Sequence, residues 1–462
     1  MPKRAVSRCT HPTLTFDSSN HAAEVGFRGP TPRQLAAVHT SIEEENTKSS
    51  GKRKRDLDTP ALGGKLFPAP LILPEDDLAL DPTHPPQSFS EWKRMRQDER
   101  NRVTNKRKTI YVIGPPAITD DVDFVQTWNQ VRSRGAKKED HIPPPDIQDV
   151  VDYLSAYYHG MTVEVLPPST ATFIAWEAKR PRAAKALAKS SKTPLIGLQT
   201  SKEIIGIRTR PSLDKAYKAQ LNLDDLLDAA IAMLPADAFA LLFLVQQDLY
   251  QSPEDEFVCG LAYGGSRVSV VSMARYHPGL DSKQEIEREH AWPASHCATY
   301  VASCCDEATN DGNKAAKRSK NGATRKESQQ ASDAIKVEQH ADTPLRAAIT
   351  AHAALPSLSS SPDPDTLTRL WLGRVCRTAS HEVAHCFGIG HCVYYGCNMQ
   401  GSASIREDAR QAPYLCPVDW AKLQKATGVD ASERSKTLIK YCNDKREIHL
   451  FAALGAWLEN TE

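Results

Sequence analysis

Residues 381–391 read His-Glu-Val-Ala-His-Cys-Phe-Gly-Ile-Gly-His, and this stretch is the most informative part of the chain. His381 and His385 are four residues apart, so on a helix their imidazoles lie on one face and can share one ion. Glu382 lies beside them, too near to be needed as a ligand but well placed to polarise a water molecule on that ion. Two helix histidines with a glutamate general base form the zinc-peptidase arrangement.

The residues after this helix predict a third ligand. Gly388 ends the helix, because glycine enters a left-handed turn without steric cost, and the reversed chain can deliver His391 to the same ion. Three neutral nitrogens bind Zn²⁺ and leave a coordination position for water, which indicates a catalytic site. The ion would lower the pKa of water from 15.7 towards about 7 and polarise the scissile carbonyl. Glu382 would then move the water proton to the leaving amine.

The alternative is three unrelated histidines. The motif requires three histidines, a glycine and a glutamate, which coincide by chance in roughly one of ten thousand chains of this length. A helical stripe within Thr366–Phe387 leads into the motif and supports the prediction. Its apolar positions are Leu372, Val375, Ala379, Val383 and Phe387.

The residues that follow the histidine motif point to a family. The segment 381–402, HEVAHCFGIGHCVYYGCNMQGS, resembles the archaemetzincins, a branch of the metzincin metallopeptidases in which this motif is fused to Cys-x4-Cys-x-Met. The resemblance includes Asp237–Tyr276 and covers approximately Thr109–Leu280 and Asp365–Gly428.

The resemblance implies a role for each matching residue. His381, His385 and His391 would hold the catalytic zinc, with Glu382 as general acid/base. Met399 would form the Met-turn, a thioether platform beneath the imidazoles; the alternative is a core methionine.

The resemblance also implies where a substrate binds. The strand Arg267–Ala274 would be the sheet edge along which an extended peptide lies. That binding mode supplies backbone hydrogen bonds that do not depend on the peptide sequence.

The family carries a second zinc held by four cysteines, which this chain matches in part. Cys392, Cys397 and Cys416 occupy three of the four positions, and Asp419 stands at the fourth. A Cys3Asp site is chemically feasible, because carboxylate oxygen can ligate zinc. Cys442 could replace the missing thiol if the C-terminal segment folds back, and the last alternative is three buried thiols without a metal.

Alternating strands and helices predict an α/β (α+β) fold, and the resemblance implies that this fold is metzincin-like. We expect a twisted mixed β-sheet of about five strands packed on the active-site helix. The expected strands are Thr109–Ile113, Met161–Leu166, Ile204–Arg208, Phe239–Val245, Phe257–Ala262 and Arg267–Ala274, and the other expected helices are Asp146–Tyr158, Leu223–Leu234, Val418–Ala426 and Ile448–Leu458.

Composition divides the chain into four parts. Residues 1–107 are rich in Pro, Ser and charge and predict a disordered basic tail. Residues 281–364 predict a low-complexity insertion. Residues 108–280 and 365–462 would form the two parts of the catalytic domain, the second with the zinc motif.

Charge and hydropathy exclude several classes of protein. The 462 residues carry 58 Lys+Arg against 57 Asp+Glu, which excludes a globally basic nucleic-acid binder. No apolar run approaches the length of a membrane span. Eleven cysteines without a secretory signal fit a reducing compartment, so we expect an intracellular protein, cytoplasmic and/or nuclear. The runs Lys52–Arg55 and Lys106–Lys108 are either nuclear-import signals or solvated charge.

These observations together predict a zinc metallopeptidase that hydrolyses peptide or protein substrates. One alternative is a non-catalytic zinc-containing protein that binds peptides in the same cleft, against which Glu382 speaks. The other is a nuclear, DNA-associated protease that contacts nucleic acid through its basic N-terminal tail.

Overall fold

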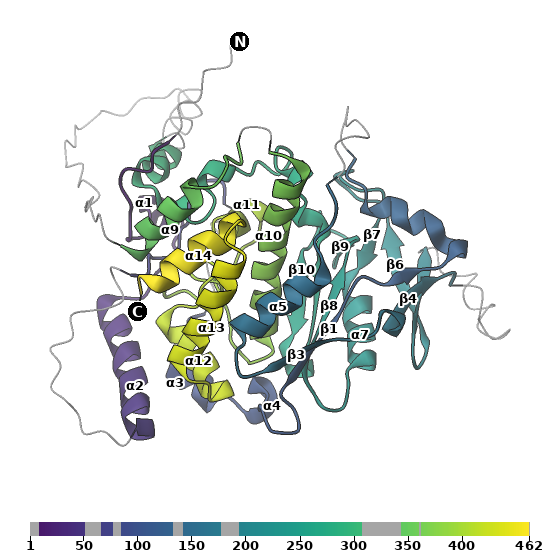
Figure 1. Ribbon diagram of the computed structural model, residues 1–462, viewed down its shortest axis with the longest axis horizontal. Helices are drawn as coiled ribbons and strands as arrows, with labels where there is room; N and C mark the ends of the chain where they lie inside the picture. The colour runs from purple at the N-terminus through teal and green to yellow at the C-terminus, as the bar shows by residue number, and fades with distance from the viewer. Residues whose placement is uncertain are drawn as a thin grey trace, which may run out of the picture.

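A five-stranded mixed sheet forms the centre of the fold, with strand order β10-β11-β8-β1-β3 (Figure 1). The structure, a computed structural model, describes residues 9–50, 66–76, 85–132, 142–176, 194–306, 343–359 and 362–461. The five strands are β1 (Thr109–Ile113), β3 (Thr162–Val165), β8 (Ala238–Val245), β10 (Gly260–Tyr263) and β11 (Val268–Ser272). Neighbouring strands are parallel except β10, which runs antiparallel to β11 at one edge. The predicted five-stranded mixed sheet is therefore present.

Strand β8 is buried along its whole length, as its continuous apolar run predicts. Leu242 and Leu244 pack into one hydrophobic core, and Leu241 and Phe243 pack into a second core on the opposite face. Alternation of side chains across the strand produces this division, because successive residues point to opposite faces.

Helices cover both faces of this sheet. The long helix α10 (Pro364–His385) begins at the N-cap Asp363 and lies with α5 (Ile147–Tyr157) in the first core. Helix α7 (Leu223–Met233) lies in the second core and is capped by Asn222. Figure 1 shows α10 beside β10, with the C-terminal helices on its other side.

A second, six-stranded sheet was not predicted, apart from one of its strands. Its order is β2-β4-β5-β6-β7-β9. Several of its strands have only two to four residues, too few for a clear alternating pattern. The strands are β2 (Ala117–Ile118), β4 (Ala171–Ile174), β5 (Leu195–Thr200), β6 (Ile204–Arg210), β7 (Gln220–Asn222) and β9 (Asp248–Tyr250).

The remaining elements surround these two sheets. Further α-helices in the described part of the chain are α1 (Asn20–Glu24), α2 (Pro32–Ser50), α3 (Phe89–Arg94), α4 (Gln97–Arg100), α9 (Pro344–Ala353), α11 (Ile405–Ala409), α12 (Pro417–Thr427), α13 (Ala431–Asp444) and α14 (His449–Glu459), and residues 298–306 are also helical. The 3-10 helices are η2 (Asp120–Asn129), η4 (Pro168–Thr170), η5 (Gly264–Ser266), η6 (Ala274–Tyr276), η7 (Pro278–Leu280), η8 (Arg288–His290) and η9 (Ala294–His296).

The prediction of a disordered tail over 1–107 is wrong for its described residues. Trp92 of α3 is 1% exposed, and its indole N–H donates to the Phe387 carbonyl over 2.9 Å. Buried residues such as Leu14, Leu71 and Trp92 anchor this segment to the domain, and anchors so widely spaced leave no periodic signal. The run Lys52–Arg55 lies outside the described residues.

The prediction of a low-complexity insertion over 281–364 is likewise wrong for the residues described there. Helix α9 packs against α14, and Leu345 is fully buried. Trp292 is 4% exposed in the first core. The polar stretch 307–342 lies outside the described residues, so its predicted disorder remains a prediction.

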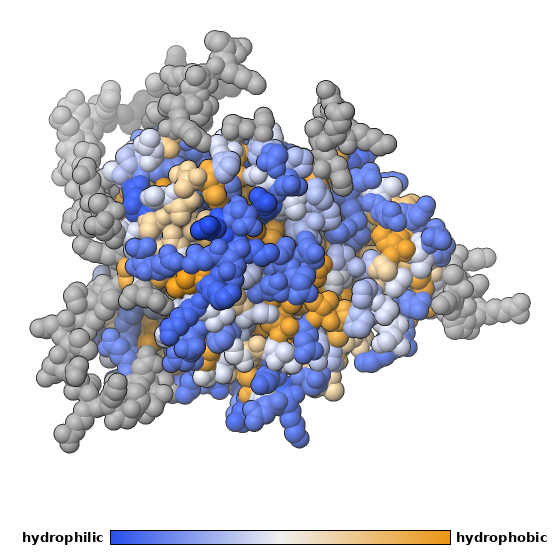
Figure 2. Space-filling model, in the orientation of Figure 1, coloured by the Kyte–Doolittle hydropathy of each residue, from blue (hydrophilic) through white to orange (hydrophobic). Residues whose placement is uncertain are grey.

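Polar and apolar residues alternate over the face in Figure 2, where apolar patches are separated by hydrophilic ones. Among the helices that the structure describes, none combines the length and apolarity that a membrane crossing requires.

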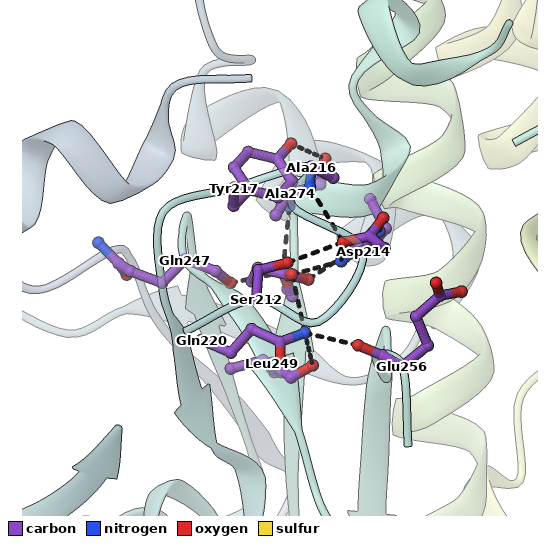
Figure 3. Close-up of polar contacts among 12 residues, drawn as sticks. Ser212, Asp214, Ala216, Tyr217, Gln220, Gln247, Leu249, Glu256 and Ala274 are labelled. Carbon is purple, nitrogen blue, oxygen red and sulfur yellow. Dashed lines mark hydrogen bonds and ion pairs between the residues drawn. The ribbon is translucent and has the colours of Figure 1, made fainter. Parts of the chain in front are cut away.

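A buried ion-pair network fixes the loops at one end of the sheets (Figure 3). Arg275 has no exposed side-chain surface and lies 2.5 Å from Asp248 and 2.8 Å from Asp214. Burial opposes ionisation of Asp214, but its hydrogen bonds to Arg275 outweigh this effect and lower its pKa. Gln220 donates to Asp248 over 2.9 Å and to the Glu256 carbonyl over 2.8 Å. The network therefore holds the segment that leads into edge strand β10.

Replacing Arg275 by Met would remove the counter-charge of the buried Asp248 and would leave Asp214 with only the partly exposed Lys283, 2.9 Å away. We expect R275M to lower the free energy of unfolding by about 3–5 kcal/mol. The matched control is R208M, because Arg208 is 47% exposed in its ion pair with Asp225. The control substitution should lower the free energy of unfolding by less than about 1 kcal/mol. Urea unfolding followed by circular dichroism measures both, and equal losses would contradict the assignment.

Candidate metal centre

Helix α10 ends within the histidine motif, and the chain then reverses as predicted. Gly388 has φ +72°, a left-handed conformation that glycine adopts freely. A Cβ atom at this position would lie 2.9 Å from the Arg100 Cα, so close packing also requires glycine. The turn brings His391 back towards His381 and His385 on the last turn of the helix.

The structure brings the three histidines together. The ring centroids lie 4.7 Å apart for His381 and His385, 5.3 Å for His381 and His391, and 5.0 Å for His385 and His391. One ligand nitrogen from each ring lies within 4.8 Å of the others. The Nε2 atoms of His381 and His385 are only 3.1 Å apart. This separation fits two nitrogens on one ion, since zinc–nitrogen bonds are about 2.0–2.1 Å long.

Backbone carbonyl groups orient two of these rings. Nδ1 of His381 lies 2.5 Å from the Asn398 carbonyl, and Nδ1 of His385 lies 2.7 Å from the Ile389 carbonyl. Each contact leaves the Nε2 atom of that ring available to bind a metal. A metal-ligating histidine usually donates its other ring N–H to a carbonyl or carboxylate group in this way. Burial lowers the pKa of both rings, so both are neutral, as ligation requires. The residues present therefore fit a zinc ion.

Glu382 lies in the same cavity as the three imidazoles. This cavity has a volume of about 720 Å³ and lies between β10 and α11. Glu382 is 8% exposed, and burial together with the nearby Asp408 raises the pKa of its carboxyl group to about 8. Asp408 was not predicted as a site residue, because only the folded chain brings α11 to the cavity.

The prediction of which strand lies at the edge of the sheet is wrong. Strand β11, within the predicted Arg267–Ala274, pairs with β8 on one side and β10 on the other. The edge strand is β10, which contributes Gly260, Leu261 and Ala262 to the cavity. Sequence patterns indicate strands but not their order in a sheet, which explains the error.

Met399 occupies the position expected of a Met-turn residue in sequence. It is fully buried in the first core, directly after Asn398, whose carbonyl contacts His381. Its own carbonyl accepts a hydrogen bond from the backbone N–H of Cys392 over 2.6 Å.

The four residues of the expected second site also converge. Ligand atoms of Cys392, Cys397, Cys416 and Asp419 lie within 4.8 Å of one another. The sulfurs of Cys392 and Cys416 are 3.6 Å apart, and Oδ2 of Asp419 lies 3.4 Å from the sulfurs of Cys397 and Cys416. Cys442 is outside this group, because it packs against Gly455 of α14.

Lys422 is a residue of this group that sequence reasoning missed. Its side chain is 1% exposed, and Nζ lies 2.8 Å from Oδ1 of Asp419. Burial raises the pKa of Asp419 to about 7, and Lys422 opposes this rise. Burial opposes ionisation of Cys397, but hydrogen bonds from Cys392 and Cys416 lower its pKa to about 6. The i,i+3 spacing of Asp419 and Lys422 on a helix is the sequence feature from which this ion pair could have been predicted.

Substitution of Gly264 tests how closely this residue packs against the end of helix α10. A Cβ atom there would lie 2.5 Å from the His385 carbonyl oxygen, whereas one at Gly265 would meet nothing within 4 Å. We expect G264A to destabilise the protein by about 1–3 kcal/mol through overpacking. It should also weaken zinc binding by displacing His385. G265A should stay within about 0.5 kcal/mol of the wild type. Thermal unfolding and zinc titration measure the stability and the zinc affinity of both variants. A G264A variant with the stability and zinc affinity of the wild type would contradict this close packing.

The segment that carries the histidines is similar to a family of known peptidases. Residues 354–425 match the profile of peptidase family M54. Archaemetzincin-2 of Homo sapiens is 40% identical over 79 residues, which are 17% of this chain and 22% of that protein. Archaemetzincin-1 of Homo sapiens is 25% identical over 249 residues, 54% of this chain and 37% of that protein. The chain thus spans about a fifth to two fifths of the length of these relatives.

An archaeal protein and its solved structure are also similar. Archaemetzincin of Methanopyrus kandleri is 42% identical over 55 residues, 12% of this chain and 29% of that protein. Its crystal structure covers 71% of this chain and 99% of its own, with 17% identity and a TM-score of 0.30. The resemblance to archaemetzincins is therefore confirmed, and it includes the segment that carries the three histidines, which matches the model of peptidase family M54.

Proposed function

We propose that this protein is a zinc-dependent metallopeptidase that hydrolyses peptide bonds. Its zinc ligands are His381, His385 and His391, and Glu382 is the general acid/base. The observation that carries the proposal is the convergence of three imidazoles beside one buried carboxyl group in an open cavity.

A bound zinc ion would supply a Lewis acid for the scissile carbonyl and would lower the pKa of the attacking water. The positive charge of a bound zinc ion would favour the ionised form of Glu382, which lies in the cavity and can then take the proton of that water and pass it to the leaving amine. The carbonyl groups of Asn398 and Ile389 keep the rings of His381 and His385 turned towards the ion.

The edge strand β10 is the proposed site of peptide binding. Gly260, Leu261 and Ala262 line the cavity on an edge of the sheet. An unpaired strand edge presents backbone N–H and C=O groups at the spacing of an extended peptide. A substrate peptide would add to the sheet there, with its scissile bond near the histidines.

The second group, Cys392, Cys397, Cys416 and Asp419, is proposed to hold a structural zinc. Three sulfurs and one carboxylate complete four ligands, which closes the site to water. Lys422 holds the other oxygen of Asp419 and so leaves Oδ2 for the metal.

An intracellular location, cytoplasmic and/or nuclear, remains a prediction, as does contact with nucleic acid through the N-terminal tail. The purely peptide-binding alternative gives Glu382 no function, so we prefer the enzyme.

Replacing Glu382 by Gln tests catalysis separately from binding. We expect E382Q to lose about 100- to 10,000-fold in kcat, because the amide cannot accept the water proton. Zinc content should stay at the wild-type level. The control is E447Q, an exposed glutamate outside the cavity, which should keep full activity. Cleavage of a fluorogenic peptide library measures the loss, and a wild-type protein that cleaves nothing would favour the peptide-binding alternative.

Removal of single ligands tests the two metal groups. We expect H385Q and C416S each to hold one zinc equivalent fewer than the wild type, because each loses a ligand from a different group. The matched control is C376S, since Cys376 is fully buried in α10 and outside both groups. Zinc is counted by inductively coupled plasma mass spectrometry. Unchanged zinc in C416S would show that the second group holds no metal.

A further inference from the structure

A third cluster of metal-ligand side chains lies outside both groups described above. It consists of Cys9, His11 and His290, whose ligand atoms lie within 4.8 Å of one another. The N-terminal segment meets the residues after η8 here: the Thr15 N–H donates to the His296 carbonyl over 2.9 Å. Two segments almost three hundred residues apart in sequence thus contribute to one cluster.

His11 presents an unsatisfied nitrogen to the cluster. Its Nε2 atom is buried and has no hydrogen-bond partner among the described residues. The ring also forms a hydrogen bond with the backbone of Glu289, and burial and the neighbouring His290 lower its pKa. A buried nitrogen without a partner costs free energy unless something binds it. A metal ion would satisfy this nitrogen.

His290 is held in an orientation that suits ligation. Its Nδ1 lies 3.1 Å from a carboxylate oxygen of Glu287, which leaves Nε2 as the free nitrogen. The ring stacks on Tyr300 with centroids 3.9 Å apart and an interplanar angle of 6°. A carboxylate behind a histidine is the usual support of a metal-ligating imidazole, because it fixes the tautomer and the ring direction.

Cys9 supplies the sulfur, and a second thiol lies nearby. The backbone N–H of Cys9 donates to Glu289 over 2.6 Å. Its sulfur lies 3.9 Å from that of Cys297, which is fully buried. Two thiolates on a tetrahedral zinc, with bonds of about 2.3 Å, lie about 3.8 Å apart. The sulfur separation in the structure is close to that value.

We propose that Cys9, His11 and His290 bind a Zn²⁺ ion. Cys297 lies outside the group of atoms within 4.8 Å of one another, but its sulfur is 3.9 Å from that of Cys9, and it would move in as the fourth ligand when the metal binds. Mixed thiolate and imidazole donors in tetrahedral number select zinc among the common cellular cations. The site would close over the metal and leave no position for water, so it is structural.

Such a site would fasten the N-terminal segment to the wall of the peptidase cavity. Arg346 already donates to the carbonyls of His11 and Pro12 over 2.6 and 3.0 Å. The segment after His290 reaches helix α11, where the Trp292 N–H donates to the Ala409 carbonyl over 3.0 Å. Helix α11 lines the cavity. Zinc would therefore stabilise the N-terminal segment and this wall together.

Zinc counting on the full-length protein, purified with a reducing agent, tests the proposal. We expect C9S and H290Q each to bind one zinc equivalent fewer than the wild type by plasma mass spectrometry. The matched controls are C305S and H21Q, two partly buried residues of the same region outside the cluster. Both should keep the wild-type zinc content. C9H, which keeps a ligand, should retain the equivalent that C9S loses.

A second measurement identifies the sulfur ligand. In the Co²⁺-loaded protein, the wild-type spectrum minus that of C9S should contain a thiolate-to-cobalt charge-transfer band. The same difference taken with C305S should be flat. If C9S is insoluble, H290Q and its zinc count decide the question.

Two results would overturn the proposal. One is equal zinc content in the wild type, C9S and H290Q. The other is a Cys9–Cys297 disulfide in the reduced, zinc-loaded protein, detected by peptide mapping. These experiments do not measure peptide hydrolysis. A protein without peptidase activity could therefore still bind the third zinc, and an active peptidase could lack it.

Discussion

The packing of helix α10 against the five-stranded sheet is the constraint on which the site depends. Val375, Ala379 and Val383 are fully buried in the first core. Each of the two valine side chains contributes about 1.5–3 kcal/mol when it leaves water. Because the stripe must face the sheet, the helix has one rotation, and that rotation turns His381 and His385 towards the cavity. The metal ligands are thus directed by apolar residues that never touch the metal.

The polar contacts act after this packing has been established. Carbonyl groups of Asn398 and Ile389 hold the two imidazoles at the end of the helix. His391 and Cys392 are adjacent in sequence, so the chain joins the histidine group directly to the cysteine group. Gln87 adds a further link, because it contacts Lys422 over 2.9 Å and the backbone of Gly390 over 2.9 Å. A residue of the N-terminal part therefore stabilises the loop between both groups.

Prediction from sequence succeeded for helices and strands whose pattern is set by residues close together in the sequence. The apolar run of β8, the helix α7 and the stripe of α10 each depend on neighbours along the chain. Prediction failed for the short strands of the second sheet, for α9 and for the anchors in the first hundred residues. These elements are stable only because distant residues cover them, and a two- to four-residue strand has too few positions to display a period.

The sequence by itself determined the chemistry of the site: three histidines, one glutamate and a glycine at spacings that a helix and a left-handed turn convert into a cluster. It also determined the departure of the second group from four cysteines, since Asp419 is visible in the sequence. Tertiary structure alone decided that β10 is the edge strand, that Lys422 pairs with Asp419, and that Cys9 meets His290. The reason is physical. Spacing along one helix is set by its own hydrogen bonds, whereas contacts between distant segments are chosen by burial and pairing across the whole chain.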